Sequence, residues 1–288
     1  MATVAIVTPV YATYQNRRID LLYQTIRSVI DQQCYARTVH IIVDDSSTVD
    51  IQSLLKQFKQ PQIRYVRREV LPTDFRTASN PLNYGIDLCK TGEDGLLTKE
   101  EAESLQGITY IHSDDILTPD SVEIRFRHLG NGFVHTRMAF FTNDRAIRYI
   151  RNGKDAKNPD NINWAAGYNF IFNAHTIMWR PQFLQYLKVF VKRKFNQDGI
   201  FDPFIADGED LDMFLSSARA AIEGEFDVRY INEVTVWYRN HQQSMSAANV
   251  GTDFHLSQQK RISDKHLPLG GNSPRNTNGT SPCLEELV

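Results

Sequence analysis

Cysteine is scarce in this sequence, and its placement excludes two structural classes. Cys34, Cys89 and Cys283 are the three cysteines among 288 residues. An odd and widely spaced set does not form the disulfide framework of a small secreted domain. No CxxC or Cys/His spacing indicates structural zinc. The sequence therefore predicts a protein of a reducing compartment.

Long apolar runs and an excess of charge of one sign are also lacking. No run approaches the ~20 residues that a membrane-spanning helix needs, and the first residues lack a signal-peptide pattern. The 32 Lys and Arg residues nearly balance 34 Asp and Glu residues, for a net charge of −2. This balance gives no electrostatic argument for nucleic acid as a partner. We expect a cytoplasmic protein, associated at most peripherally with the inner face of a membrane, and leave its oligomeric state open.

The first third of the chain alternates short apolar runs with amphipathic segments. The runs predict buried strands over residues 4–10, 39–43 and 63–66, and the helical spacing predicts helices over 18–33 and 50–58. Such alternation is typical of parallel strands joined by crossover helices, which is an α/β fold. Ligands of these sheets bind at the carboxyl ends of the strands. We expect the polar groups 8–11 and 44–47 to lie at that edge.

The rest of the chain is less regular. We predict a helix over 80–89, a polar insertion over 91–106, a strand over 107–112, antiparallel additions to the sheet over 138–180, a helix over 210–221 and one or two strands over 226–238. From residue 267 the composition shifts to Gly, Asn, Ser, Pro and Thr. The sequence therefore predicts one domain over 1–266 and a disordered tail over 267–288.

Acidic side chains fall in three groups at the ends of predicted elements, namely Asp44/Asp45, Asp114/Asp115 and Glu209/Asp210. Each group alone is explained by a turn or a helix cap. Three such groups in one α/β chain favour a functional site over three separate turns or caps. Carboxylates directly after a strand offer oxygen ligands to a hard cation such as Mg²⁺ or Mn²⁺, which would take its other ligands from water and phosphate. A diphosphate ligand suits this arrangement, because the cation supplies positive charge that the composition lacks.

Four segments, in order, resemble those of family 2 glycosyltransferases. Residues 4–11 with 28–33 and 42–47 resemble the start of that family. The sequence His-Ser-Asp-Asp at 112–115 resembles its metal-binding DxD element, with Ser at the first acidic position. The sequence Gly-Glu-Asp-Leu-Asp at 208–212 resembles its ED element, and Trp-Tyr-Arg-Asn-His at 237–241 resembles a less constant C-terminal element. The resemblance implies a GT-A fold, which is a Rossmann-like nucleotide-binding mixed sheet flanked by helices, with antiparallel additions on the acceptor side.

The resemblance also implies a nucleotide-sugar donor, with a UDP-sugar expected, and Mn²⁺ or Mg²⁺ as cofactor. It implies roles for the donor-side residues in turn. Thr8, Pro9 and Tyr11 would line the base pocket, Asp45 would accept a hydrogen bond from the uracil imide, and Arg76 or Asn83 would reach the base or ribose. Asp114 would contact ribose or metal-bound water, and Asp115 would bind the metal directly. His241 would complete the metal shell, with a surface histidine as the alternative.

On the acceptor side, the resemblance implies that Asp210 is the general base of an inverting transfer to a hydroxyl of a glycan or lipid-linked acceptor in polysaccharide biosynthesis. Glu209 would bind the acceptor, and Arg239 would contact the diphosphate. His175 would lie under the acceptor site, with a hydrogen-bonded core pair as the preferred alternative. Trp164, with Tyr168 and Phe170, would form a stacking platform for a sugar, which strand packing explains equally well.

Two other functions remain open at this point. The first is a sugar nucleotidyltransferase, which needs a Gly-rich loop with a basic residue after the first strand, whereas residues 8–13 contain neither. The second is a binding module without catalysis, which the acids at all three positions disfavour. Residues 183–195 combine an apolar stripe with basic residues and predict either an interfacial helix or, as we prefer, a helix packed on the sheet.

Overall fold

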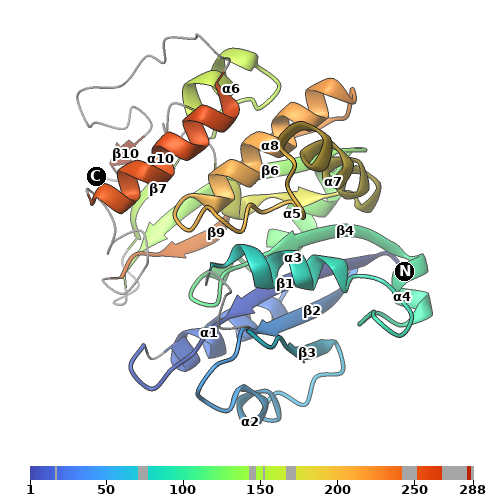
Figure 1. The fold of residues 1–288 in the computed structure, drawn as a ribbon. Helices are drawn as coiled ribbons and strands as arrows, with labels where there is room; N and C mark the ends of the chain where they lie inside the picture. The colour runs from blue at the N-terminus through green and yellow to red at the C-terminus, as the bar shows by residue number, and fades with distance from the viewer. Residues whose placement is uncertain are drawn as a thin grey trace.

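Helices flank one mixed β-sheet in this chain (Figure 1). The computed structural model describes residues 1–16, 18–70, 77–142, 147–151, 153–166, 173–241, 252–267 and 284–286. The predicted α/β fold is confirmed in these residues. The order of strands along the main path of the sheet is β10-β7-β6-β8-β4-β1-β2-β3, and β9 pairs with both β5 and β6.

Four parallel strands form the part of the sheet that the first third of the chain predicts. They are β1 (Thr3–Val10), β2 (Arg37–Asp44), β3 (Ile63–Arg67) and β4 (Leu105–Tyr110). All eight residues of β1 are buried, because the strand is central and helices cover the sheet. In register, Val10 pairs with Asp44 and Val7 pairs with Tyr110, so β1, β2 and β4 end at the same edge.

The connecting segments contain α1 (Arg18–Ile30), α2 (Ile51–Leu55), α3 (Ser79–Asp87) and α4 (Lys99–Glu103). The first three confirm predicted helices, although each ends two to three residues before the end of its predicted range. Helix α3 lies very close to the sheet, since a Cβ on Gly85 would come within 2.5 Å of Val7 Cγ1. Only glycine permits this approach. The helix α4 lies inside the predicted polar insertion and has a capping box between Thr98 and Glu101, so that segment is partly structured.

The second half of the chain extends the sheet and covers it. Its elements are β5 (Ile116–Leu117), α5 (Ser121–His128), β6 (Phe133–Phe141), β7 (Ile147–Arg151), α6 (Pro159–Ala166), the 3₁₀ turn η1 (Ala174–Thr176), β8 (Met178–Trp179), α7 (Pro181–Phe195), α8 (Glu209–Glu223), β9 (Val228–Arg239) and α10 (Asp253–His266). The predicted antiparallel additions are confirmed by β7 and β8, which both run antiparallel to β6. The same region also contains helical segments, and β9 is one long strand parallel to β6.

Helix α7 follows the packed alternative that the sequence left open. Its apolar stripe is buried in the main core, at Phe183, Leu184, Leu187, Phe190 and Val191. Three of its basic side chains form ion pairs on the surface, Lys188 with Asp87, Lys192 with Asp198 and Arg193 with Glu223. The helix is thus held by its apolar face, with its positive charge compensated locally. No helix among the described residues is long and apolar enough to cross a membrane.

Helix α10 is the last helix of the described residues and lies against α6 and α8 (Figure 1). Beyond Leu267 the structure describes only β10 (Leu284–Glu286), which pairs antiparallel with β7. The domain limit at 266 and the tail over 267–288 stay predictions.

Candidate active site

The carboxyl ends of β1, β2 and β4 bring the predicted donor residues to one edge of the sheet. Tyr11 follows β1, Asp45 follows β2, and residues 112–115 follow β4. The side chain of Tyr11 is 40% exposed, as a ring that stacks on a ligand must be. Thr8 and Pro9 lie within β1 and are buried. The Thr8 hydroxyl lies 2.8 Å from His40 Nε2, inside the sheet, and the expected place of Thr8 and Pro9 in a base pocket stays a prediction.

Asp45 lies at the predicted position and is held by a cation from the neighbouring strand. Arg68 Nε donates to Asp45 Oδ1 over 2.7 Å, directly after β3. The adjacent Asp44 is equally engaged, because the Tyr65 hydroxyl donates to its Oδ2 over 2.7 Å and Arg67 Nη1 does so over 3.2 Å. The end of β3 therefore orients both carboxylates, a contribution that the sequence did not indicate.

Asn83 connects α3 to the segment before α8. Its Nδ2 donates to the carbonyl of Phe201 over 2.8 Å, and its Oδ1 accepts from the Phe201 amide over 3.0 Å. Both ends of the side-chain amide thus hold the backbone of residue 201, and the expected contact of Asn83 with base or ribose stays a prediction. The other candidate, Arg76, lies outside the described residues.

Asp114 is an ionised carboxylate held between two basic side chains. Its Oδ2 contacts Arg18 Nη1 and lies 2.9 Å from His241 Nε2. Burial acts to raise the pKa of Asp114, but the hydrogen bond to His241 and the charge of Arg18 hold it well below its usual range. His241 therefore lies beside the acidic pair in contact with Asp114, and its place in a metal shell stays a prediction. Arg18 is a site residue that the sequence did not reveal.

Asp115 has a buried carboxylate oxygen without a partner. The Arg239 amide donates to its Oδ1 over 2.9 Å, whereas Oδ2 contacts no donor among the described residues. Burial and the charge of Asp114 raise the pKa of Asp115 to about 7. A carboxylate in this environment needs a proton or a cation, so Asp115 Oδ2 fits a hard divalent metal. Within the described ranges, no group of three or more His, Cys, Asp or Glu side chains could hold a metal.

Arg239 fixes the turn that carries the two aspartates. Besides its amide contact to Asp115, its Nε donates to the carbonyl of Asp114 over 2.8 Å and its Nη2 donates to Gln24 Oε1 over 2.9 Å. Its guanidinium carbon lies 4.5 Å from the centre of the Phe141 ring. These contacts tie β9 to the 114–115 turn and to α1. The expected diphosphate contact stays a prediction, and the described contacts give Arg239 a positioning role.

The second acidic group begins α8. Gly208 precedes it with a φ of 86°, a left-handed conformation that favours glycine and directs the chain into the helix. Asp210 Oδ2 lies 2.5 Å from His175 Nε2. Burial acts to raise the pKa of Asp210, but the charge and the hydrogen bond of His175 hold it well below its usual range. Burial likewise acts to lower the pKa of His175, and Asp210 raises it to about 9. The pair is thus ionised at neutral pH.

The Asp115 and Asp210 groups face a common set of buried aromatic rings. Tyr110, at the end of β4, packs edge-on against both His112 and His175. Its hydroxyl is buried without a described partner, as is His175 Nδ1. The charges of Asp210, Glu209 and Asp115 all act on the Tyr110 hydroxyl, after burial, to raise its pKa. Unpartnered polar atoms from three segments are typical of a site that binds a ligand.

Trp164 lies on α6, and nothing is described of its side chain. Tyr168 and Phe170 lie outside the described residues. The predicted stacking platform therefore stays a prediction.

The sequence also missed Tyr110, His112 and Tyr238 as parts of the site. Tyr110 and His112 lie four and two positions before Asp114, so proximity to that element is the signal that points to them.

Glu209 provides a test of the electrostatics of this site. Burial and the charge of Asp210 raise its pKa to about 8. Because its folded-state pKa is raised, the contribution of Glu209 to the free energy of unfolding is most favourable below the unfolded pKa of about 4.3 and is lost as the pH rises through 8. Because glutamine does not ionise, Glu209→Gln removes this pH-dependent loss of stability. We expect the variant to melt at a higher temperature than the wild type at pH 8.5, with a smaller difference at pH 5. An equal difference at both pH values would contradict this ionisation.

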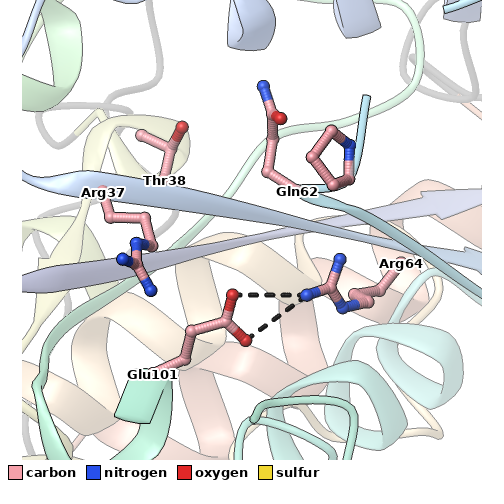
Figure 2. Close-up of a pocket in the computed structure, with 6 residues that line it drawn as sticks. Arg37, Thr38, Gln62, Arg64 and Glu101 are labelled. Atoms are coloured by element: carbon pink, nitrogen blue, oxygen red, sulfur yellow. Dashed lines mark hydrogen bonds and ion pairs between the residues drawn. The ribbon is translucent and has the colours of Figure 1, made fainter. Parts of the chain in front are cut away.

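A separate pocket of about 380 Å³ lies at the amino ends of β2 and β3, away from the candidate site (Figure 2). It is lined by Arg37, Thr38, Pro61, Gln62, Arg64 and Glu101. Arg64 Nη2 donates to both oxygens of Glu101, over 3.2 and 3.4 Å, and Arg37 pairs with Glu100. Its cations are therefore already compensated, and the pocket lies at the edge opposite to the acidic groups.

Comparison with known families decides the relationship of this chain. A family model described as "Glycosyl transferase family 2" matches residues 5–199. The chain belongs to this family. The match includes both Asp45 and the Asp114/Asp115 pair, and ends before Asp210. The resemblance inferred from the sequence motifs is thereby confirmed. A sequence comparison with curated proteins gives no match.

Solved structures of similar fold include TarS and a mannosyltransferase. The first 349 residues of TarS from S. aureus match with a TM-score of 0.55 and 11% identity, over 93% of this chain and 71% of that chain. The same fragment has also been solved with UDP, at a TM-score of 0.50. The mannosyltransferase PcManGT from Pyrobaculum calidifontis, in complex with GDP-Man and Mn²⁺, matches with a TM-score of 0.54 and 15% identity, over 94% of this chain and 65% of that chain. These likenesses confirm the GT-A fold.

Proposed function

We propose that this chain is an inverting glycosyltransferase that uses a nucleotide-diphosphate sugar, a divalent metal and a hydroxyl acceptor. The observation that carries the proposal is the pair of acidic sites around one buried aromatic cluster. Asp115 offers an unpartnered oxygen to a cation, and Asp210 offers an ionised carboxylate on the first turn of α8. The first arrangement suits a diphosphate with its metal, and the second suits a base for the acceptor.

The donor would lie along the carboxyl ends of β1, β2 and β4. Tyr11 stacks on the base, and Asp45 accepts a hydrogen bond from the imide N–H of uracil. The exposed ring of Tyr11 and the Arg68 contact that orients Asp45 support these roles. TarS has been solved with UDP and PcManGT with GDP-Man, which supports a nucleotide-sugar donor for this chain. We favour a UDP-sugar because Asp45 suits an imide donor.

Mn²⁺ or Mg²⁺ would be held by Asp115 and by oxygens of the diphosphate and water. When bound, such a cation neutralises the charge that develops on the departing diphosphate, so no side chain is needed as an acid there. Asp114, paired with Arg18 and His241, stays ionised beside it. Arg239 keeps the 114–115 turn in place.

The chemical step assigned to Asp210 is general base catalysis. Its carboxylate takes the proton of the acceptor hydroxyl while that oxygen attacks C1 of the donor sugar. The C1–O bond to the diphosphate breaks, and the diphosphate leaves with both bonding electrons. A single displacement of this kind inverts the configuration at C1. Glu209, beside Asp210 and mostly protonated at neutral pH, would donate a hydrogen bond to the acceptor, which we take to be a glycan or a lipid-linked sugar.

Asp45→Ala tests the base pocket. We expect the dissociation constant for UDP to rise about 10-fold, since a hydrogen bond to a charged group contributes roughly 1.5–3 kcal/mol. Calorimetric titration with UDP and with CDP, which lacks the imide N–H, gives the measurement. Asp31→Ala, on the exposed end of α1, is the matched control. Equal UDP affinity in the wild type and Asp45→Ala would remove Asp45 from the pocket.

The experiment that tests the function is a panel of UDP-, dTDP- and GDP-sugars incubated with the protein and Mn²⁺. Release of the nucleoside diphosphate is measured for the wild type and for Asp210→Asn. The proposal is supported if the wild type releases the nucleoside diphosphate from at least one donor and Asp210→Asn does not. Donor binding with no release by either protein would favour the binding module. Pyrophosphate release from a nucleoside triphosphate and a sugar phosphate would favour the nucleotidyltransferase.

A further inference from the structure

The carboxylate of Asp210 is not presented by α8 alone. Its Oδ2 is in contact with His175 Nε2 at 2.5 Å, in a pair whose side chains are 22% and 13% exposed respectively. His175 comes from η1, the short turn between α6 and β8, and belongs to none of the sequence motifs of the family. The pair therefore joins two segments that the sequence keeps 35 positions apart.

The ring of His175 is itself held from several sides. The Tyr238 ring, on β9, stacks on it with a centroid distance of 5.1 Å and an interplanar angle of 6°. His112 packs edge-on at 4.9 Å, and Tyr110 packs edge-on at 6.2 Å. These contacts restrict rotation of the imidazole about its side-chain bonds. A ring so confined can fix the direction of the carboxylate that it contacts.

We propose that His175 is the positioning residue of the Asp210 base, holding Oδ2 so that Oδ1 faces the acceptor hydroxyl. This inference rests on the proposed function and deepens it. A general base works only within hydrogen-bond reach of the proton that it takes, and a displacement of about 1 Å costs on the order of 100-fold in rate. His175 keeps its own proton throughout, and the acceptor proton ends on Asp210.

The charged and titratable groups around the pair come from four elements. They are Glu209 on α8, Tyr110 on β4, His112 and Asp115 in the turn after β4, and Tyr238 on β9. The imidazolium of His175 is the nearest positive group to Asp210, since it makes the only described ion pair of that carboxylate. Loss of the imidazolium should therefore move the acid limb of the kcat profile to higher pH, as the pKa of Asp210 rises.

Two substitutions separate this role from a structural one. His175→Phe keeps a ring for the Tyr238 stack but removes the hydrogen bond, and we expect kcat to fall about 100-fold. The KM for the donor and the dissociation constant for UDP should stay within about twofold of wild type, since the described contacts of His175 include neither Tyr11 nor Asp45. His175→Gln supplies an amide N–H at a similar reach, and its kcat should be about 10-fold higher than that of His175→Phe.

His255→Phe is the matched control, because His255 Nδ1 and Asp207 Oδ2 form a second, buried pair of the same 2.5 Å length. We expect it to lower the melting temperature while kcat stays within about twofold. If His175→Phe had the kcat and pH profile of the wild type, this inference would be overturned while the proposed function stood. Equal losses of UDP affinity and kcat would have the same consequence. A wild-type protein that turns over no donor would overturn the proposed function and this inference with it.

Discussion

Asp210→Asn is expected to lower kcat by about 1,000-fold while leaving the affinity for the donor nearly unchanged. General base catalysis contributes roughly 100- to 10,000-fold, and asparagine keeps the shape of the side chain but cannot take a proton. The pKa of Asp210 lies well below its usual range because His175 stabilises the carboxylate, so the base is ready at neutral pH without prior deprotonation. Asp210 lies on the first turn of α8, whereas Tyr11 and Asp45 of the proposed base pocket follow β1 and β2.

The measurement is single-turnover transfer with saturating donor, combined with calorimetric titration of UDP. Asp198→Asn, a substitution of the same kind at an exposed residue after α7, is the control. A kcat for Asp210→Asn within about tenfold of wild type would assign the base to another residue. Loss of UDP binding in the same variant would show that Asp210 supports the donor site instead.

Asp115→Asn is expected to abolish tight Mn²⁺ binding and to lower kcat/KM by on the order of 1,000-fold, because a metal supplies several kcal/mol of stabilisation to a departing diphosphate. The buried Oδ2 of Asp115 has no described donor, so an amide there can neither bind a hard cation well nor replace its charge. Binding of Mn²⁺ in the presence of UDP, followed by electron paramagnetic resonance, measures the first effect.

The same substitution carries an opposite expectation for stability. Burial and the neighbouring Asp114 disfavour the ionised form of Asp115, so the metal-free variant should melt at a higher temperature than the metal-free wild type at pH 8. Asp120→Asn, in the next turn, is the control and should bind Mn²⁺ as the wild type does. Unchanged Mn²⁺ affinity in Asp115→Asn would place the metal elsewhere.

The edge that carries the acidic groups was predictable because its strands are apolar throughout. Residues 4–10 and 39–43 have to be buried on both faces, and parallel pairing then brings their carboxyl ends together. The observed register of Val10 with Asp44 follows from this constraint. The acidic start of α8 was predictable for a similar reason, since Glu209 and Asp210 precede a long amphipathic run and favour a helix amino terminus.

The side-chain pairs within the site were not predictable in the same way. No sequence pattern indicated that Thr8 contacts His40 or that Asn83 holds the backbone of Phe201, because polar groups in packed segments take partners that only the tertiary fold provides. The contact of His175 with Asp210 depends on how η1 lies beside α8, which no local pattern specifies. Arg18 and Arg68 likewise reach their aspartates only through the packing of α1 and β3.

The central claim is that Asp210 directs a hydroxyl oxygen onto C1 of the donor sugar in a single displacement. The most direct measurement is the anomeric configuration of the first product formed from an α-linked nucleotide sugar, observed by proton nuclear magnetic resonance during turnover. We predict a β-configured product, which Asp210→Asn fails to form. An α-configured first product would mean retention through a different chemical route, and would contradict the role given to Asp210.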